Sequence, residues 1–188
     1  MLAMAQLATP QLEEGLDHVR SSPTDMGTLD LIVARPATGE REVLAEGQLD
    51  LDLGLVGDNW RERGSRHTED GSAERDKQLN VINARLAALV AGEDPDRRAL
   101  AGDQLHVDLD LSIENLPAGS RLHLGEAVIE ITPSPHTGCA KFTQRFGLDA
   151  LRFVNSPAGK ELRLRGLCAR VVVPGTIRQG DQVVVERP

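Results

Sequence analysis

Aromatic side chains are scarce in this chain of 188 residues, which has three Phe, one Trp and no Tyr. A chain of this length buries a substantial core, so aliphatic side chains must fill it. Long apolar runs are missing as well, and none approaches the roughly 20 residues that a transmembrane helix needs. The first residues lack the basic and apolar regions of a secretory signal. We therefore expect no association with a membrane.

Cysteine is also rare, and the two cysteines, Cys139 and Cys168, are too few for a disulfide framework. Their number fits a reducing compartment, so the expected location is the cytoplasm. Cys168 lies within the apolar run 167–173, where a thiol packs as a small hydrophobic side chain. We expect no disulfide between the two cysteines.

Positive charge is in deficit, because 21 Lys and Arg face 29 Asp and Glu for a formal net charge of −8. Nucleic acids and anionic membranes are bound through basic faces. The charge balance therefore argues against both as partners. A local basic pocket for a small anionic ligand remains compatible with this composition.

Familiar catalytic and nucleotide-binding motifs are absent from the sequence. It contains no Gly-x-Gly-x-x-Gly, no phosphate-binding loop, no Cys-x-x-Cys and no Gly-x-Ser-x-Gly. The chain therefore offers no recognisable nucleotide, zinc or serine-hydrolase site.

Short stretches of alternating polarity dominate the pattern and predict strands. They begin near Thr28 and cover 49–55, 78–82, 105–113, 126–132, 167–173 and 182–186. Few helices separate them, among them one capped by Thr9 and one capped by Asn83. Many short strands with few short helices indicate a curved or closed sheet. The predicted fold class is mainly β within α+β, with an N-terminal tail and helical extension over 1–27 and a β-barrel domain over 28–188.

The most polar segment, 61–77, predicts a long loop, and such loops either bind ligands or remain mobile. Its arginines, Arg75 among them, offer an anion clamp, and a solvated loop is the alternative. Just before this segment, Gly57 and Asp58 predict a turn. The same turn can form a pocket wall, with Trp60 as a rim or stacking residue.

The stretch 133–146 has the pattern most typical of chemistry. It joins an expected strand to a short expected helix, and its two prolines hold the chain extended. Thr137 is the expected helix N-cap, which would put Cys139 in the first turn, near free amide groups. His136 and Lys141 flank this thiol, and cationic neighbours favour the thiolate. We interpret Cys139 as a reactive sulfur.

The alternative interpretation is that Cys139 only packs, as most cysteines do. Phe142 and Phe146, four residues apart, are more typical of the core face of a helix than of a ligand platform.

Several separate stretches resemble the MOSC domain, the family named after the C-terminal domain of molybdenum cofactor sulfurases. In chain order they are Gly54–Asp58, Leu100–Gly119, Leu122–Ala127, Pro135–Lys141, Arg165–Val171 and Gly180–Asp181. Their order and spacing carry the resemblance, which spans most of residues 28–186. The N-terminal helix lies outside this core and resembles the extension of short, stand-alone bacterial members.

The resemblance implies a β-barrel-like fold and a molybdenum–pterin cofactor. Cys139 matches the family's characteristic cysteine, so it is implied to carry sulfur as a persulfide or to ligate molybdenum. His136 and Lys141 become its catalytic neighbours. Implied cofactor-binding residues are Thr137 and Gly138 beside it and Asp58 and Asp103 on matching glycine–aspartate turns, which Trp60 and Arg75 join as pocket-wall and anion-clamp candidates.

Larger relatives carry a pyridoxal-phosphate desulfurase domain, which this sequence lacks. A sulfur donor such as a cysteine desulfurase would therefore have to be a partner protein, and pyridoxal phosphate would enter only through it. Two other functions remain open. One is a component of a reductase system that detoxifies N-hydroxylated compounds with redox partners, and the other is a non-catalytic binding or assembly module.

Overall fold

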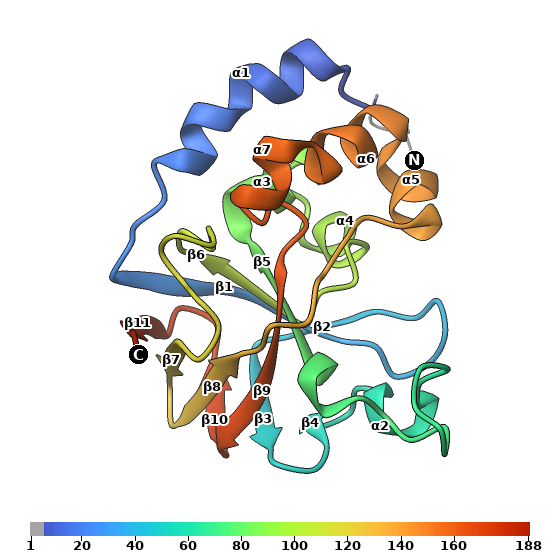
Figure 1. Cartoon of the computed structure of the whole chain (residues 1–188), viewed down its shortest axis with the longest axis vertical. Coiled ribbons are helices and arrows are strands. Elements are labelled where there is room, and N and C mark those ends of the chain that lie inside the picture. The colour runs from blue at the N-terminus through green and yellow to red at the C-terminus, as the bar shows by residue number, and fades with distance from the viewer. Residues whose placement is uncertain (1–5) are drawn as a thin grey trace.

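A computed structural model describes residues 6–188 as a β-barrel covered at one end by helices (Figure 1). The helices are α1 (Thr9–Arg20), α2 (Trp60–Arg63), α3 (Ala84–Ala91), α4 (Pro95–Ala99), α5 (Ala140–Phe146), α6 (Leu148–Asn155) and α7 (Pro157–Glu161), and η1 (Arg75–Lys77) is a 3-10 turn. The strands are β1 (Met26–Ala34), β2 (Glu42–Leu44), β3 (Glu46–Asp50), β4 (Gly54–Leu55), β5 (Leu79–Asn83), β6 (Leu105–Asp108), β7 (Arg121–Leu124), β8 (Ala127–Ile131), β9 (Leu167–Val173), β10 (Gly175–Arg178) and β11 (Gln182–Glu186).

Seven strands form a closed ring in the order β1-β11-β7-β8-β9-β5-β6, with β6 pairing back to β1. Neighbours in the ring run antiparallel except β5 and β6, which are parallel. A ring with an odd number of strands cannot alternate direction throughout, so it needs such a pair. The connection between these two strands contains α3 and α4, as a parallel crossover requires. The prediction of a mainly β, barrel-type fold with a few short helices is confirmed.

Strand β1 serves two partners along one edge, because residues 26–28 pair with β11 and residues 32–34 pair with β2. A separate three-stranded sheet, β10-β3-β4, lies at the end of the barrel opposite α1 and α3 to α7 (Figure 1). Leu49, Leu55 and Ile177 of this sheet join the aliphatic cluster of the barrel. The small sheet therefore completes the core at that end.

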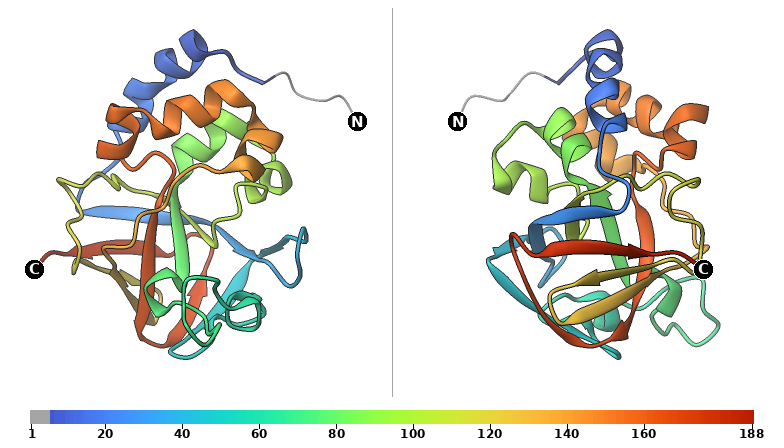
Figure 2. Two further views of the ribbon diagram at one scale, coloured as in Figure 1. Left: turned by 45° about the vertical axis from the view of Figure 1, so that its right-hand side comes forward. Right: turned by 90° about the vertical axis from the view of Figure 1, so that its left-hand side faces the viewer.

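Most of the buried apolar side chains lie in the barrel interior or in a layer beneath the helices, and Leu31, Val33 and Ala99 form a small third cluster. Figure 2 shows the helices stacked on one end of the barrel. The described side chains of the interior are Leu, Ile, Val and Ala, as the scarcity of aromatics predicts. The layer under the helices holds all three phenylalanines, Phe142, Phe146 and Phe153. Side chains alternate along a strand, so inward residues meet inside the barrel and outward residues meet the helices.

The predicted strand 49–55 is instead a hairpin. The Oδ1 atom of Asp50 accepts hydrogen bonds from the amides of Asp52 and Leu53, and this turn separates β3 from β4. An aspartate that binds the backbone two residues ahead produces a turn whose polarity also alternates. The period of two therefore arises here partly from a turn.

The predicted strand 105–113 also ends early, because β6 stops at Asp108. Beyond it, the Asp110 amide donates to the Pro23 carbonyl and Asp110 Oδ1 accepts from the Ser112 amide. These contacts draw the chain away from the barrel ladder.

The helix caps agree only in part with the prediction. Asn83 caps α3, since its Oδ1 accepts from the Leu86 amide at 3.0 Å. The expected cap at Thr9 is wrong, because Ala8 occupies that position and Thr9 is the first helical residue of α1. Over the described residues, no helix combines the length and apolar character needed to traverse a bilayer.

Candidate functional site

Residues 132–139 connect β8 to α5 beside β9, and we call them the strap (Figure 1). At its start, the Thr132 amide donates to the Cys168 carbonyl of β9 at 3.0 Å. Near its end, the side chain of Asn155 on α6 accepts from the Gly138 amide at 3.0 Å and donates to the Gly138 carbonyl at 3.3 Å. These anchors fix the position of the following residue, Cys139.

Cys139 is the N-cap of α5, and its side chain is exposed. The prediction that Thr137 caps this helix and places Cys139 in the first turn is wrong. With φ −130° and ψ 178°, Cys139 is still extended, and the helix begins one residue later. The clamp of Asn155 on Gly138 explains this, because it holds the strap extended up to the cysteine.

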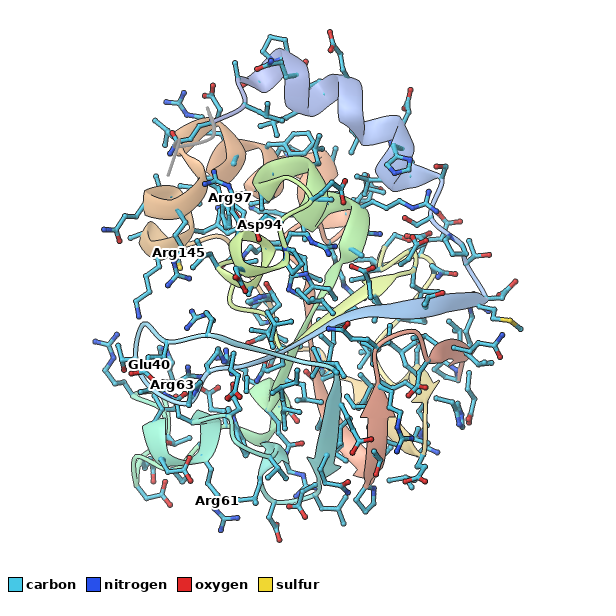
Figure 3. All side chains as sticks on the ribbon, turned by 180° about the vertical axis from the view of Figure 1, so that it is seen from behind. Glu40, Arg61, Arg63, Asp94, Arg97 and Arg145 are labelled. Carbon is cyan, nitrogen blue, oxygen red and sulfur yellow. The ribbon has the colours of Figure 1, made fainter. Side chains whose placement is uncertain are left out.

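Cys139 and His136 share a pocket of about 160 Å³ with cationic side chains from the β1–β2 loop, α2, α5 and the residues before β9. These side chains are Arg35, Arg41, Arg63, Lys141, Arg145 and Arg165. We call this the cationic pocket. Figure 3 shows Arg145 and Arg63 on one side of the molecule, above and below the loop that carries Glu40.

Asp58 lies behind the cationic pocket, where it is buried. Its carboxylate accepts from Arg35 Nε at 2.7 Å and Arg35 Nη2 at 2.9 Å, and from the amides of Arg35 and Trp60. Both oxygens are therefore engaged within the fold. Asp58 positions Arg35 and offers no free oxygen to a ligand.

Asp103 forms a second buried support. Arg165 Nη1 donates to its two oxygens at 2.9 and 2.7 Å, and His136 Nε2 lies 2.8 Å from Oδ1. Burial alone would raise the pKa of Asp103, but Arg165 and His136 outweigh it and hold the pKa well below the usual value. Gly166, with φ +102°, packs closely here, because a Cβ would lie 2.3 Å from the Val81 carbonyl oxygen and 3.2 Å from His136 Cδ2.

His136 is neutral at neutral pH, because burial and the neighbouring Arg165 lower its pKa and together outweigh Asp103. An ionised carboxylate only accepts, so Nε2 carries the proton that Asp103 binds. The other ring nitrogen, Nδ1, is then an acceptor. His136 thus has the state of a proton-accepting base in the same pocket as Cys139.

Positive charge is uncompensated in the cationic pocket. Arg41, Arg63, Lys141 and Arg145 form no ion pair with any carboxylate in the part of the chain that the structure describes. Burial, and then the charges of Arg145 and Arg35, lower the pKa of Arg41 to about 10. Such a pocket is suited to an anion with more than one negative charge.

A second chamber of about 330 Å³ adjoins the cationic pocket and shares Arg63, Asn80 and His136 with it. Trp60, which is buried, and Cys168 line this chamber. Burial raises the pKa of the Cys168 thiol to about 11, and Asn80 Nδ2 donates to its sulfur at 3.5 Å. Cys168 is therefore a neutral packing thiol, as expected, and neither cysteine is in a disulfide.

The remaining predicted residues are distributed as follows. Lys141 lines the cationic pocket, and Thr137 lines the second chamber. Gly138 anchors the strap. Arg75 is exposed in η1 and lies outside the set of residues that line the two chambers.

Sequence reasoning did not single out most of the pocket arginines. Arg35 and Arg41 share the β1–β2 loop, whereas Arg145 and Arg165 lie more than 100 residues further along the chain. One local signal was available at Arg35, a charged residue directly after the buried run 31–34 and before a proline. A charge at the end of a buried strand requires a partner, and that partner is Asp58.

The described side chains do not by themselves form a metal site, because no group of three or more His, Cys, Asp or Glu gathers among residues 6–188. Cys139 offers one sulfur ligand, and the surrounding cations suit an anionic group that brings a metal with it. The residues present therefore fit a phosphate-bearing metal cofactor better than a bare metal ion.

Comparison with known proteins gives a family and a fold. A family model described as the MOSC domain matches residues 68–184, more than half of the chain. No curated protein matches it significantly in sequence.

Among solved structures, the chain is similar to the YUAD protein from Bacillus subtilis, with a TM-score of 0.66 and 15% identity over 87% of this chain and 97% of that chain. It is also similar to YiiM from Escherichia coli, with a TM-score of 0.55 and 20% identity over 86% of this chain and 70% of that one. For YiiM from Geobacillus stearothermophilus the TM-score is 0.52, with 14% identity over 88% and 75% of the two chains. At these identities the likeness concerns the fold. Together with the matched family model, it leads to one conclusion: the chain belongs to the MOSC domain family.

Proposed function

We propose that this protein binds a molybdenum–pterin cofactor through its phosphate in the cationic pocket and uses Cys139 as the sulfur site. The observation that carries the proposal is an exposed thiol in a pocket with six cationic side chains and, among its described lining residues, no carboxylate. A phosphate dianion requires such donors, and guanidinium groups bind it with paired hydrogen bonds.

The residues divide into binding and supporting roles. Arg41, Arg63, Lys141 and Arg145 would hold the phosphate, since no carboxylate in the described chain pairs with them. Asp58 and Asp103 would keep Arg35 and Arg165 in place. When bound, the cofactor supplies a redox-active metal, to which Cys139 would offer one thiolate.

As a sulfur carrier, Cys139 would react with a persulfide of a donor protein. His136 Nδ1 takes the proton of the Cys139 thiol, and the thiolate attacks the outer sulfur of the donor. A sulfur–sulfur bond forms at Cys139, the donor's sulfur–sulfur bond breaks, and the departing donor thiolate recovers a proton from His136. The donor would be a partner such as a cysteine desulfurase, which would bring its own pyridoxal phosphate.

The test uses full-length protein produced in a molybdenum-replete host. We expect native mass spectrometry to show bound cofactor, and expect Arg63→Ala and Arg145→Ala each to lower its occupancy about ten-fold, the effect of losing one charge-assisted contact. Arg61→Ala is the matched control, because Arg61 lies on the same helix, outside the pocket lining (Figure 3). Equal occupancy in Arg61→Ala and Arg63→Ala, or no pterin in the wild-type protein, would overturn cofactor binding.

The sulfur role has its own readout. After incubation with a persulfide donor, mass spectrometry should find one added sulfur atom on Cys139, none in Cys139→Ser, and none on Cys168, which is buried. Labelling by iodoacetamide in the folded state should follow the same order. An unmodified Cys139 would leave the cofactor-binding proposal standing without the sulfur role.

A reductase component acting on N-hydroxylated compounds is the second candidate, favoured by the second chamber, which gives space beside the cationic pocket for a substrate. It predicts reduction of an N-hydroxylated probe such as benzamidoxime by the cofactor-loaded protein with an artificial electron donor. Failure of this reaction with loaded protein would reject this candidate.

A further inference from the structure

A groove of about 430 Å³ lies where four segments of the chain meet. These segments are the loop that follows β6, the strap, the helices α6 and α7, and residues 163–167, which lead into β9. His136 and Arg165 line this groove as well as the cationic pocket, and the other residues of the two linings differ. The volume is within the range of cavities that hold small molecules.

Part of the groove lining is apolar. Ile113, Pro133, Val154 and Leu167 contribute this part. Val154 and Leu167 are buried, whereas about half of Ile113 is exposed. The apolar body of a ligand would remove this exposed surface from water, which favours binding.

The charged part of the lining offers positive charge without a counter-ion. Lys160 and Arg163 line the groove, and the described lining contains no Asp or Glu. Neither cation forms an ion pair with a carboxylate between residues 6 and 188. Arg165, by contrast, is paired with Asp103. Lys160 and Arg163 are therefore the two cations that an anion in the groove could bind.

Arg163 is held in an uncommon backbone conformation. Its φ of +47° makes it the one residue other than glycine with a positive φ in the described chain. This conformation is unfavourable for a residue with a Cβ, and where the surrounding structure enforces it, a ligand site is often near. Nη1 of Arg163 donates to the Leu116 carbonyl at 2.6 Å and to the Leu111 carbonyl at 3.4 Å. One nitrogen thus anchors the guanidinium group.

The other two guanidinium nitrogens of Arg163, Nε and Nη2, form no hydrogen bond with the described chain. Neither is among the buried polar atoms that lack a partner, so solvent reaches both. Arg35 binds the two oxygens of Asp58 through this same pair of nitrogens. Arg85 binds Asp108 in the same way. Arg163 therefore leaves open the side of its guanidinium group that pairs with carboxylates elsewhere in this molecule.

We infer that the groove binds a small molecule with an apolar body and one carboxylate group. The carboxylate would accept paired hydrogen bonds from Arg163, with Lys160 as a second cation, and the apolar body would cover Ile113. A single negative charge matches the site, because only two of its cations are unpaired. The inference does not depend on the proposed cofactor binding. The bound molecule would lie next to His136, which lines both cavities.

The test is isothermal titration calorimetry of the full chain with three probes that share one apolar body. The probes are para-tert-butylbenzoate, para-tert-butylbenzamide and para-tert-butylbenzylamine, which carry a negative, a neutral and a positive group. We expect the benzoate to bind at one site, the amide to bind about ten-fold more weakly through loss of the charge-assisted pair, and the amine not to bind. This comparison uses the wild-type protein, so it stands even if a variant fails to fold.

Variants then locate the binding site. Lys160→Gln should weaken benzoate binding about three-fold, the effect of one exposed charge, and Arg163→Gln should weaken it about ten-fold. The matched control is Arg152→Gln, because Arg152 is exposed on α6 and lies outside the groove lining. Ile113→Glu and Ile113→Lys remove the same apolar contact and add opposite charges, so the Glu variant should bind the benzoate more weakly than the Lys variant.

Equal binding of the three probes, or no binding of the benzoate, would overturn the inference. Equal benzoate binding by Ile113→Glu and Ile113→Lys would do the same. Loss of benzoate binding in Arg145→Ala but not in Lys160→Gln would assign the probe to the cationic pocket and would also reject the inference. Cofactor occupancy, measured by native mass spectrometry, reports separately on the proposed function.

Discussion

Two buried aspartates determine where the arginines of the cationic pocket point. Asp58 binds Arg35 through both of its oxygens, and Asp103 binds Arg165 in the same way. Neither aspartate is itself among the residues that line the cationic pocket. The two glycine–aspartate turns therefore supply supporting residues. A ligand in the pocket would contact the arginines that Asp58 and Asp103 hold in place.

The Asp103→Asn variant tests this support. It leaves Arg165 buried without its charge partner, so we expect the free energy of unfolding to fall by about 3–5 kcal/mol. Denaturant unfolding at pH 7 measures the loss. Asp52→Asn, at an exposed turn position, is the matched control and should be near neutral.

The loss of stability at low pH, measured by the same denaturant unfolding, gives a second check. The folded-state pKa of Asp103 is depressed, so its contribution is present above its ordinary pKa and is lost as pH falls through the folded value. Asp103→Asn should therefore have a shallower loss of stability below about pH 4. An unchanged loss of stability at low pH would contradict the ion-pair account.

For the secondary-structure elements, the sequence predicted the type of an element more reliably than its boundaries. The barrel-type fold and the Asn83 cap followed from polarity patterns and capping chemistry. The strands predicted at 49–55 and 105–113 were too long, because turns formed by aspartate have the same alternating polarity as a strand. Long-range contacts decide these cases, and local pattern cannot show them.

The site was predictable only where its residues are close in sequence. Cys139, His136 and Lys141 lie within six positions, and the structure places all three in one pocket. The cap at Thr137 failed because Asn155, a residue of another helix, holds the strap extended. The arginines come together through the long-range pairing of β1, β6, β5 and β9, which local spacing does not reveal.

Asn155 is the residue through which α6 controls the strap. We expect Asn155→Ala to lower the free energy of unfolding by about 1–3 kcal/mol, since both backbone groups of Gly138 lose their partner. The amide of Gly138 should exchange with solvent faster in this variant, which NMR can measure. Asn155→Asp keeps the acceptor for the Gly138 amide and should retain most of the protection. Equal exchange in Asn155→Ala and wild type would show that the clamp does not hold the strap.

For the whole molecule, burial makes stability depend on pH through His106. This side chain is fully buried in β6, and neither ring nitrogen has a hydrogen-bond partner in the described chain. Burial lowers its pKa from 6.5 to about 4, with Asp103 opposing and Arg98 assisting. Between pH 6.5 and pH 4, His106 therefore binds a proton in the unfolded chain but not in the folded chain.

We therefore expect the free energy of unfolding to fall as pH decreases from 6.5 to 4, with about 3 kcal/mol of the loss due to His106. The lowered pKa of His136 acts in the same direction. His106→Leu should remove the larger part of this slope, measured by denaturant unfolding across the pH range. His18→Leu, at an exposed position of α1, should leave the slope intact. An equal slope in both variants would contradict the assignment to His106.

The pairing of β11 with β1 also has a consequence for biosynthesis. The seam joins Met26 to Val184, so nearly all of the described chain is synthesised between its two halves. Until residue 186 has left the ribosome, β1 and β7 each present an open edge of the kind that recruits other strands. Closure of the ring is thus a late and long-range event, and such events are slow. Nascent chains of this protein should therefore depend on chaperones for longer than those of a helical protein of equal size.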